Sequence, residues 1–511
     1  MSGRTLLEAT VGILLCALGY FLAHRESYEV HTVLATAGGC QVATDIYEPR
    51  SGSPVGSVIL FHGLAANKRV MSFNAQGFAN QGLRVFVPDL PGHGRTPGPY
   101  SADRDDSCAL ALVRDLGARK AIVPERTILA GHSLGGAIAI RTASQFPVAG
   151  VIALSPAPMR VVPGFSPEMV PFHDVPVLPQ HSLILTGQWE PGPIRSLAQE
   201  LVRPSLSPPA TTPAPLSTSK YEMIPHTTHV SILFSRKTFS ALCAWTSQLL
   251  GTHPDAPFPA NMPALGCILG IVGLAILVPP FLREMNTSPK SAPANPTFTP
   301  SFAKALLIAT TVALAVALLL ASRIVPVHFA RLFNGDYLAV FLFLTGLVVL
   351  AVYYRALPAL KSLLPSSLTS TCASALVLVL LFAGWFELTF YEAWFTPARW
   401  LRFPLLLLLL LPWHFAEEIL LGPPASSGDL RRLAKAFALR SGIYVALFLG
   451  IQYLHSGAIL LFLLLAYFVV FTALQRLACD LVRFRTQSPA SAAIFGAILL
   501  AAFSLAIFPV A

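Results

Sequence analysis

The chain has 511 residues, of which 54% are hydrophobic and only 12% are charged, and its formal net charge is +10. The charged fraction is roughly half that of ordinary globular proteins, and the mean hydropathy of +0.63 indicates a membrane protein. The basic excess does not indicate nucleic-acid binding, because most of it lies in loops between apolar segments, where it is a topology signal.

The apolar residues are distributed unevenly and divide the chain into four predicted parts. An apolar run at residues 6–23 has no good signal-peptidase site, so we expect a retained signal anchor. The parts are an N-terminal anchor at 1–24, a soluble α/β domain at 25–251, a proline-rich linker at 252–263, and an all-α membrane domain of about eight transmembrane helices at 264–511.

Basic residues predict how the membrane domain is oriented. The predicted spans cover residues 264–282, 303–322, 336–354, 372–394, 402–421, 438–455, 457–475 and 491–510. With the anchor, they put on the N-terminal side Arg283, Lys290, Lys304, Arg355, Lys361, Arg431, Arg432, Lys435, Arg476, Arg483 and Arg485, and on the other side only Arg323, Arg331, Arg399 and Arg402. The positive-inside rule then predicts an integral protein of the plasma or inner membrane whose soluble domain faces away from the cytoplasm.

Short apolar strands alternate with helical stretches through the soluble domain. A strand pair at 29–34 and 40–47 is joined through Gly38-Gly39, and the continuous apolar run at 58–61 is typical of a buried parallel strand. Further strands are expected at 83–89, 128–130, 150–155, 181–186 and 221–224, and helices at 103–119 and 235–250. This alternation predicts a doubly wound, mostly parallel α/β sheet.

Other features of the soluble domain carry less information. Residues 156–180 are proline-rich and are expected to form a modest cap, and residues 204–217 a flexible surface insertion. The seven cysteines show no metal-like spacing. Cys40, Cys108 and Cys243, the three in this domain, are interpreted as small core residues, so they do not indicate a redox compartment.

The sequence Gly131-His132-Ser133-Leu134-Gly135 follows the apolar run at 128–130 and precedes a small-residue segment. This Gly-x-Ser-x-Gly pattern is typical of a strand that turns sharply into a helix with a serine at its tip. A bulky side chain at Gly131 or Gly135 would collide within the turn. The turn would hold the Ser133 hydroxyl out of the sheet, with the amides of the helix N-terminus aimed at the same place.

A serine nucleophile needs a base, a group that orients the base, and donors for the oxyanion. With this requirement in view, residues 30–250 resemble the α/β-hydrolase family of serine esterases and lipases. The matching pieces are His62-Gly63, Pro88-Asp89-Leu90-Pro91-Gly92-His93-Gly94, Gly131-His132-Ser133-Leu134-Gly135, Gly187-Gln188-Trp189-Glu190-Pro191 and His229.

The resemblance implies a role for each matching residue. Ser133 is the expected nucleophile, and His229, between the last strand and the final helix, is the expected general base. Glu190 stands where the family usually has aspartate, and is the expected triad acid. The backbone amides of Leu64 and Leu134 are the expected oxyanion donors. No cofactor and no metal are implied.

Two of these assignments have alternatives in the sequence. Asp174 in the cap is a reserve acid, and His226 is an alternative base. The apolar run at 230–234 resembles the segment after the family's histidine, which favours His229. Four other polar residues of the motifs are interpreted as packing or hydrogen-bonding groups, namely His62, Asp89, His93 and His132.

Several ionisable residues lie in or near the apolar spans, where such groups are costly and often functional. They are Glu387, Glu392, His414, Glu417, Glu418 and His455. The sequence around Glu417-Glu418 faintly resembles the paired-glutamate motif of intramembrane CAAX-type proteases, but the arginine expected shortly after the pair is absent. We therefore interpret these residues as interfacial groups or as partners in hydrogen bonds between helices.

Together these features predict a membrane-bound serine hydrolase that cleaves carboxylic esters through an acyl-enzyme. Its expected partners are a small-molecule or lipid ester and membrane lipid, and no nucleic acid. Lipid-like esters suit a site beside a bilayer. Two alternatives are a membrane transporter in which the α/β domain binds substrate, and an acyltransferase. The sequence determines neither the substrate nor the oligomeric state.

Overall fold

The computed structural model describes residues 3–156, 178–202, 219–285, 301–322, 324–357, 367–453, 460–461 and 464–511. The chain forms two compact units. The helical unit comprises Met1–Tyr20, Cys267–Phe386 and Ala393–Phe508, and the α/β unit comprises Phe21–Gly266, Glu387–Glu392 and Pro509–Ala511. Two short stretches from the C-terminal half of the sequence therefore belong to the α/β unit.

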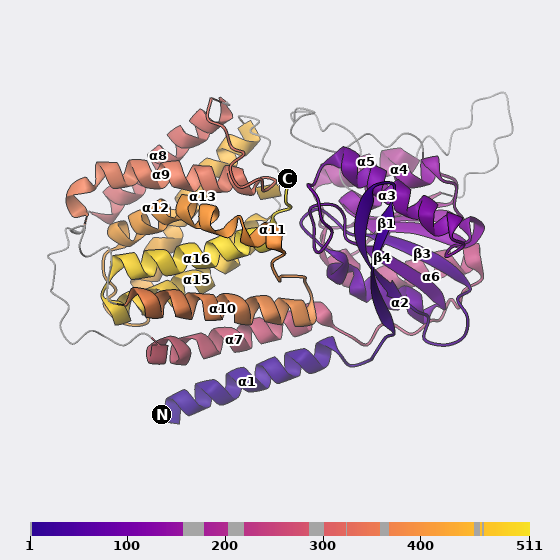
Figure 1. Cartoon of the computed structure of the whole chain (residues 1–511), viewed down its shortest axis with the longest axis horizontal. Helices are drawn as coiled ribbons and strands as arrows, with labels where there is room; N and C mark the ends of the chain where they lie inside the picture. Colours follow the sequence, from indigo (N-terminus) through magenta and orange to yellow (C-terminus); the bar gives the residue numbers. More distant parts are fainter. Residues whose placement is uncertain are drawn as a thin grey trace. The chain divides into compact units, whose positions relative to one another are not determined.

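An eight-stranded sheet forms the centre of the α/β unit (Figure 1). Its strands are β1 (Val30–Ala37), β2 (Cys40–Tyr47), β3 (Gly56–Phe61), β4 (Leu83–Pro88), β5 (Thr127–His132), β6 (Gly150–Leu154), β7 (Ser182–Gly187) and β8 (Lys220–Ile224). Their order is β1-β2-β4-β3-β5-β6-β7-β8. The pairs β1–β2 and β2–β4 are antiparallel, and the remaining pairs are parallel. The predicted mostly parallel α/β sheet is confirmed.

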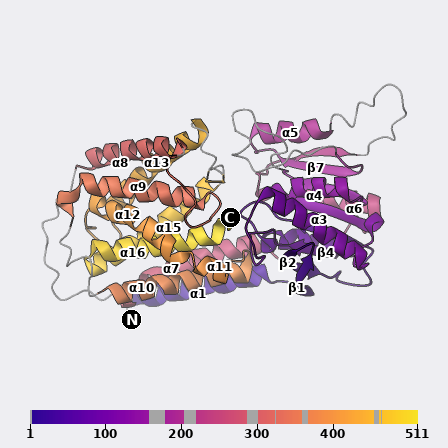
Figure 2. The ribbon, with the colours of Figure 1, turned by 45° about the horizontal axis from the view of Figure 1, so that its top comes forward.

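Helices cover both faces of this sheet. Val58 and Leu60 of β3 share one core cluster with residues of α2 (Ser72–Asn80) and α6 (Arg236–Leu250). Successive side chains of a strand point to opposite faces, and Phe61 lies instead beside Leu112 of α3 (Ala102–Ala118). α4 (Leu134–Gln145) lies with α3 on that second face, and α5 (Gly192–Val202) packs against β7 and β8 (Figure 2). Burial on both faces explains the continuous apolar strands.

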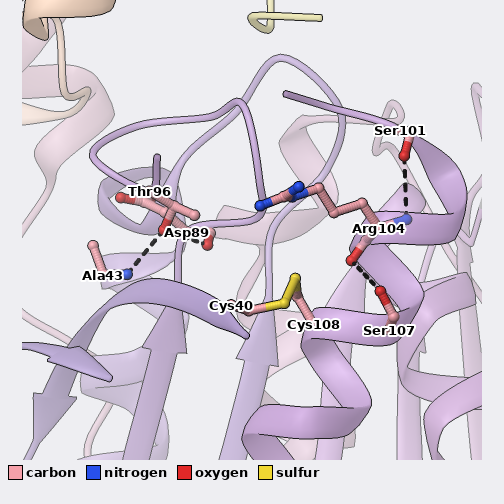
Figure 3. The surroundings of a disulfide bond; sticks show 8 residues. All are labelled: Cys40, Ala43, Asp89, Thr96, Ser101, Arg104, Ser107 and Cys108. Atoms are coloured by element: carbon pink, nitrogen blue, oxygen red, sulfur yellow. Dashed lines mark hydrogen bonds between the residues drawn. A yellow bond between two sulfur atoms is a disulfide. The ribbon is translucent and has the colours of Figure 1, made fainter. Parts of the chain in front are cut away.

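A disulfide joins Cys40, the first residue of β2, to Cys108 in α3 (Figure 3). The two Cα atoms lie 5.6 Å apart, although the cysteines are 68 residues apart in the sequence. Both residues are buried, as interpreted, but the interpretation missed the bond between them. The pairing depends on α3 packing across the end of the β1–β2 hairpin, which no local pattern encodes. Cys243 is a buried free thiol, as interpreted.

The helical unit is built almost entirely from helices, most of them long and apolar. They are α1 (Gly3–Ala23), α7 (Pro263–Met285), α8 (Phe302–Ala321), α9 (Gly335–Val352), α10 (Leu368–Thr389), the short α11 (Pro397–Trp400), α12 (Phe403–Leu421), α13 (Leu430–Tyr453), α15 (Leu465–Thr486) and α16 (Pro489–Ile507). Among the described residues, eight helices are long and apolar enough to cross a membrane, and α15 is not one of them.

Glycines let the helices of this unit approach closely. A side chain at Gly346 of α9 would collide with the backbone of α12 at Trp413, and a Cβ at Gly496 of α16 would lie 2.7 Å from His414 Cδ2. α12 thus lies between α9 and α16 (Figure 1). Small residues at helix contacts are typical of membrane bundles, where close packing replaces the hydrophobic effect.

Two helices extend beyond the bounds predicted for their spans. α13 begins at Leu430 rather than at residue 438, and α15 (Leu465–Thr486) continues past residue 475, where the span predicted at 457–475 ends. Residues 457–459 and 462–463 of that span lie outside the described residues. The predicted bounds put Arg432, Arg476 and Arg483 in loops, but all three lie inside these helices and are buried. A prediction from hydropathy ends a span at such charged residues, because hydropathy takes no account of oppositely charged side chains that pair with them inside the protein.

Candidate active site

Ser133 lies at the turn between β5 and α4, with backbone angles φ 55° and ψ −119°. The residues two positions before and two positions after it must be glycine for this turn to form. A Cβ at Gly131 would overlap the Gly135 carbonyl, and one at Gly135 would overlap the carbonyl of Phe61. The collision expected at Gly131 and Gly135 is confirmed. The two glycines allow the turn that places Ser133, a largely buried residue, at the carboxyl edge of the sheet.

His229 faces Ser133 across this edge. Its Nε2 atom lies 2.9 Å from Ser133 Oγ, within hydrogen-bond distance. His229 follows β8 and precedes a 3-10 helix, η5 (Ser231–Phe234). His226 is placed differently, because its amide donates to Gln188 Oε1 and its ring lies against Trp189. Of the two histidines weighed from the sequence, the structure brings His229 to the serine.

His132 holds the backbone beneath His229. Its Nε2 donates a hydrogen bond to the carbonyl oxygen of His229 over 2.7 Å. Burial disfavours the charged imidazolium and lowers the pKa of His132 to about 3, so this ring is a neutral donor at physiological pH. The interpretation of His132 as a hydrogen-bonding group agrees with this contact.

Glu190 lies behind His229, after β7. Its carboxylate is almost fully buried, and Oε2 lies 3.8 Å from His229 Nδ1. Neither of these two atoms has a hydrogen-bond partner elsewhere in the described part of the chain. The other oxygen, Oε1, accepts from the Gly187 amide at 2.9 Å and from the Ser155 hydroxyl. Glu190 is thus held with one free oxygen directed to the imidazole.

Ser155 is a residue that the sequence reasoning did not identify. It follows β6 with a positive φ of 46°, and its hydroxyl donates to the Glu190 carboxylate. Its position directly after a buried strand was the available signal, because open α/β sheets build their sites at the carboxyl ends of strands.

The loop after β3 brings Gly63 and Leu64 beside the nucleophile. A Cβ at Gly63 would lie 3.2 Å from the Ser133 Cβ and 3.1 Å from His132 Nδ1. Leu134 is the first residue of α4, where backbone amides have no acceptor within the helix. The two backbone segments expected to donate to an oxyanion therefore both adjoin Ser133.

Residues 58–269 match the family model described as the alpha/beta hydrolase family. Together with the sheet order and the serine turn, this match decides the fold. The α/β unit has the α/β-hydrolase fold.

The hydrolase domain is similar to parts of mycobacterial lipases. A monoacylglycerol lipase of Mycolicibacterium smegmatis is 32% identical over 140 residues, which are 27% of this chain and 49% of that protein. Lipase LipV of Mycobacterium tuberculosis is 32% identical over 118 residues, which are 22% of this chain and 42% of that protein. The chain thus spans less than half the length of these relatives.

Solved structures of esterase-like proteins are also similar to this chain. XC6422 from Xanthomonas campestris, described as a serine hydrolase without lid, is 18% identical, covers 45% of this chain and 97% of its own, and gives a TM-score of 0.35. EstE1, a carboxylesterase cloned from a metagenomic library, is 14% identical, covers 49% of this chain and 97% of its own, and gives a TM-score of 0.36.

Polar residues around the hydrolase site tie its loops together. The Leu90 amide donates to His62 Nε2 at 2.9 Å, so His62 Nδ1 carries the proton and donates to the Gly63 carbonyl at 2.8 Å. Asp89 accepts from the amides of Lys68 at 2.8 Å and Arg95 at 3.0 Å. These contacts agree with the interpretation of His62 and Asp89 as structural groups. The reserve acid Asp174 and most of the predicted cap lie outside the described residues, as does the insertion at 204–217.

The paired glutamates of the helical unit are engaged by arginines. Glu417 accepts from Arg440 at 2.6 and 2.7 Å and from Arg476 at 3.0 Å. Glu418 accepts from Arg432 at 2.7 Å and also from Arg476. The described residues contain no group of three or more side chains suited to a metal ion. Glu417 and Glu418 thus form bonds between helices, which is one of the two roles interpreted for them, and His455 lies outside the described residues.

A cavity of about 260 Å³ lies within the helical unit between α9, α12 and α16. Its lining is apolar and consists of Leu350, Leu411, Pro412, Phe415, Ala490 and Ile494. It offers no nucleophile and no titratable side chain, so it is not a second reactive site.

Proposed function

We propose that this protein is a membrane-bound serine hydrolase that cleaves carboxylic esters, with Ser133, His229 and Glu190 as its catalytic triad. The observation that carries the proposal is the 2.9 Å contact between Ser133 Oγ and His229 Nε2 at a turn that glycines at 131 and 135 allow. The likeness of the hydrolase domain to proteins named as lipases supports an ester, including a lipid-derived one, as the substrate.

The mechanism follows from this geometry. Ser133 Oγ attacks the ester carbonyl carbon while its proton passes to His229 Nε2. The negative charge that develops on the carbonyl oxygen is stabilised by the amides of Leu64 and Leu134. The imidazolium then gives its proton to the leaving alcohol, and an acyl-enzyme forms. Water repeats the sequence, with His229 again as base, and releases the carboxylic acid.

Glu190 serves as the group that orients the base. Its buried carboxylate stabilises the imidazolium that forms during each step, because it accepts a hydrogen bond from Nδ1 of His229. The present separation of 3.8 Å is longer than a hydrogen bond. Such contacts are often long in the absence of substrate and shorten in the reacting complex.

We also propose that the hydrolase domain lies outside the cytoplasm. The eight long apolar helices support attachment to a membrane. The disulfide between Cys40 and Cys108 supports the orientation, since disulfides persist in oxidising compartments and are rare in the cytosol.

Labelling with a fluorophosphonate probe and an ester hydrolysis assay on the purified full chain test the function. We expect the wild type to be labelled and to hydrolyse p-nitrophenyl esters, and Ser133→Ala to lose both activities. Ser144→Ala is the matched control, because Ser144 lies on the same helix α4 and its hydroxyl donates to the Arg141 carbonyl one turn earlier, away from His229. Glu190→Gln should lower kcat by about 100-fold or more while Ser133 stays in place.

Two results would overturn the proposal. One is a folded wild type that the probe does not label, and the other is equal labelling of Ser133→Ala. Product analysis with an added alcohol distinguishes hydrolysis from acyl transfer, because a transferase would form the new ester instead of the free acid.

A further inference from the structure

The loop that carries Leu64 is held by a segment more than three hundred positions later in the sequence. This segment, Glu387–Glu392, belongs to the α/β unit, although its two flanks belong to the helical unit. The Tyr391 hydroxyl donates a hydrogen bond to the Ala65 carbonyl oxygen over 3.0 Å. The Asn67 side-chain amide donates to the Glu392 carbonyl over 3.5 Å. The segment thus contacts Ala65 and Asn67, which lie one and three positions after Leu64.

Charge pairs join the same segment to this loop and to the loop after β4. Lys68 Nζ lies 2.9 Å from Asp89 Oδ2 and is also paired with Glu392. The side chains of Lys68 and Glu392 are only 1% and 3% exposed. Arg95 reaches Glu387 over 2.5 Å. A buried lysine between two carboxylates is costly to disturb, because removal of a partner leaves charge without compensation.

The loop needs such support because its backbone is strained. Ala65 has a positive φ of 59°, and a non-glycine residue in this region costs about 1 kcal/mol or more. Its amide donates to His93 Nε2 over 3.3 Å, and its carbonyl accepts from Tyr391. The Leu64 amide belongs to the Gly63–Leu64 peptide unit, which only the backbone torsions of Leu64 separate from the Leu64–Ala65 unit that His93 holds, so the direction in which it points depends on how Ala65 is held.

The segment also adjoins the loop that carries the base. Phe390 lies against Phe234 at the end of η5, with 6.0 Å between the ring centroids. Phe390 and Tyr391 pack on the core cluster that contains Ile232 and Leu233 of η5. One short segment therefore contacts both the loop after β3 and the helical turn after His229.

We propose that Glu387–Glu392 is a positioning element of the esterase site, in which Tyr391 and Glu392 hold the Ala65–Lys68 loop so that the Leu64 amide meets the oxyanion. The proposal rests on the proposed function. It assigns a role in the oxyanion site to the end of α10 and the residues directly after it, a short stretch of the α/β unit whose largest part is Phe21–Gly266. Both residues are positioning residues, because neither touches the reacting atoms.

The test uses the full-length protein with Tyr391→Phe, which removes one hydrogen-bond donor and keeps the ring. Rates are measured per active site titrated with the fluorophosphonate probe, together with KM for an ester and Ki for an alkyl boronic acid, which forms a tetrahedral anion on the serine. We expect kcat to fall and Ki to rise by about five- to tenfold, the equivalent of one ordinary hydrogen bond, with KM changed less than twofold. Glu392→Gln should act in the same direction.

Tyr28→Phe is the matched control, because Tyr28 is also half-buried in the hydrolase domain and donates through its hydroxyl, to Glu26 and Asn80. Its kcat and Ki should equal those of the wild type. If Tyr391→Phe lowers only the melting temperature and leaves kcat and Ki per titrated site unchanged, the positioning role is wrong. If the proposed function itself is wrong, the result is different, because the wild type will then show no hydrolysis that depends on Ser133.

Discussion

Four non-glycine residues with positive φ angles lie directly after strands of the hydrolase sheet or in the turns that follow them. They are Ala65 (59°), Ser133 (55°), Ser155 (46°) and His226 (58°). Such backbone conformations persist only where surrounding contacts hold them, and they gather at functional sites. Two further such residues in the described part of the α/β unit, Lys120 and His181, lie before strands, so four of the six gather at the edge of Ser133, which supports a reactive site there.

Asp105 in α3 is a buried acid that lies outside the proposed triad. It is fully buried, and neither carboxylate oxygen has a hydrogen-bond partner among the described residues. Burial, and after it the neighbouring Asp106 carboxylate, raises the pKa of Asp105 well above its ordinary value. Asp105 therefore keeps its proton in the folded state at pH values where the unfolded chain has lost it.

The sign of the pH effect follows from this difference. Above about pH 4 the unfolded chain releases the Asp105 proton and the folded state retains it, so this residue lowers the free energy of unfolding as the pH rises toward the folded pKa. Each unit by which the folded pKa is raised corresponds to about 1.4 kcal/mol. We predict that Asp105→Asn has a higher melting temperature than the wild type at pH 7 and an equal one near pH 4.

Thermal unfolding of the full chain between pH 4 and pH 8 measures this. Asp103→Asn is the control, because Asp103 is exposed in the first turn of the same helix. A difference between Asp105→Asn and the wild type that does not grow with pH would contradict the assignment.

At the scale of elements, the disulfide ties α3 to the β1–β2 hairpin at the edge of the sheet. β1 has only one neighbouring strand, and its side chains are largely exposed, so few other contacts hold it. By the chain-entropy model, a cross-link that closes a loop of this length contributes about 4 kcal/mol. We predict that Cys40→Ala/Cys108→Ala lowers the melting temperature by several degrees.

Maleimide labelling of the denatured chain checks the bond itself. Five of the seven cysteines should react without reductant, and all seven should react after reduction. Cys243→Ala is the control for the loss of a thiol, since Cys243 is free and buried. Seven labels without reductant would contradict the bond.

The helices α13 and α15 carry the arginines that hydropathy placed in loops, and acids of α12 and α15 pair with them. Arg476 bonds to Glu417, to Glu418 and to Asp480, which lies one turn along its own helix. Arg432 bonds to Glu418 and Asp480. These arginines are bound by acids inside the bundle, so they are not free loop charges, and the contrast in loop charge that predicts the orientation is smaller than the sequence alone indicates.

At the scale of the whole molecule, the composition of the α/β unit constrains the proposed membrane topology. The unit contains Phe21–Gly266, Glu387–Glu392 and Pro509–Ala511. The last of these are bound within it, because Val510 exchanges backbone hydrogen bonds with Gly92 and Tyr100. The three stretches belong to one compact unit, so the proposed membrane topology has to place them on the same side of the bilayer.

Cysteine accessibility in intact cells tests this orientation, in a background where the five free cysteines are alanine. Ser51→Cys lies at an exposed position of the hydrolase domain and should react with a membrane-impermeant maleimide without lysis. Ser426→Cys, exposed between α12 and α13, should react only after lysis. The opposite pattern would place the hydrolase domain in the cytoplasm.

The sequence by itself determined the features that depend on neighbouring residues. Continuous apolar runs predict buried parallel strands, and Gly-x-Ser-x-Gly between a strand and a helix predicts the turn at Ser133, because sterics within a few residues decide both. The chain order of Ser133, Glu190 and His229 at strand ends predicts where their side chains meet, since parallel strands end at one edge.

Only the tertiary structure decided the features that join distant parts of the chain. The pairing of Cys40 with Cys108, the contact of Ser155 with Glu190, and the burial of Arg476 among acids all depend on which elements pack together. The same holds for Tyr391, which follows an apolar run and has no local sign of a role beside Leu64. A single hydrogen bond or ion pair across such a distance leaves no periodicity in the sequence, because its energy depends on the geometry of the folded chain.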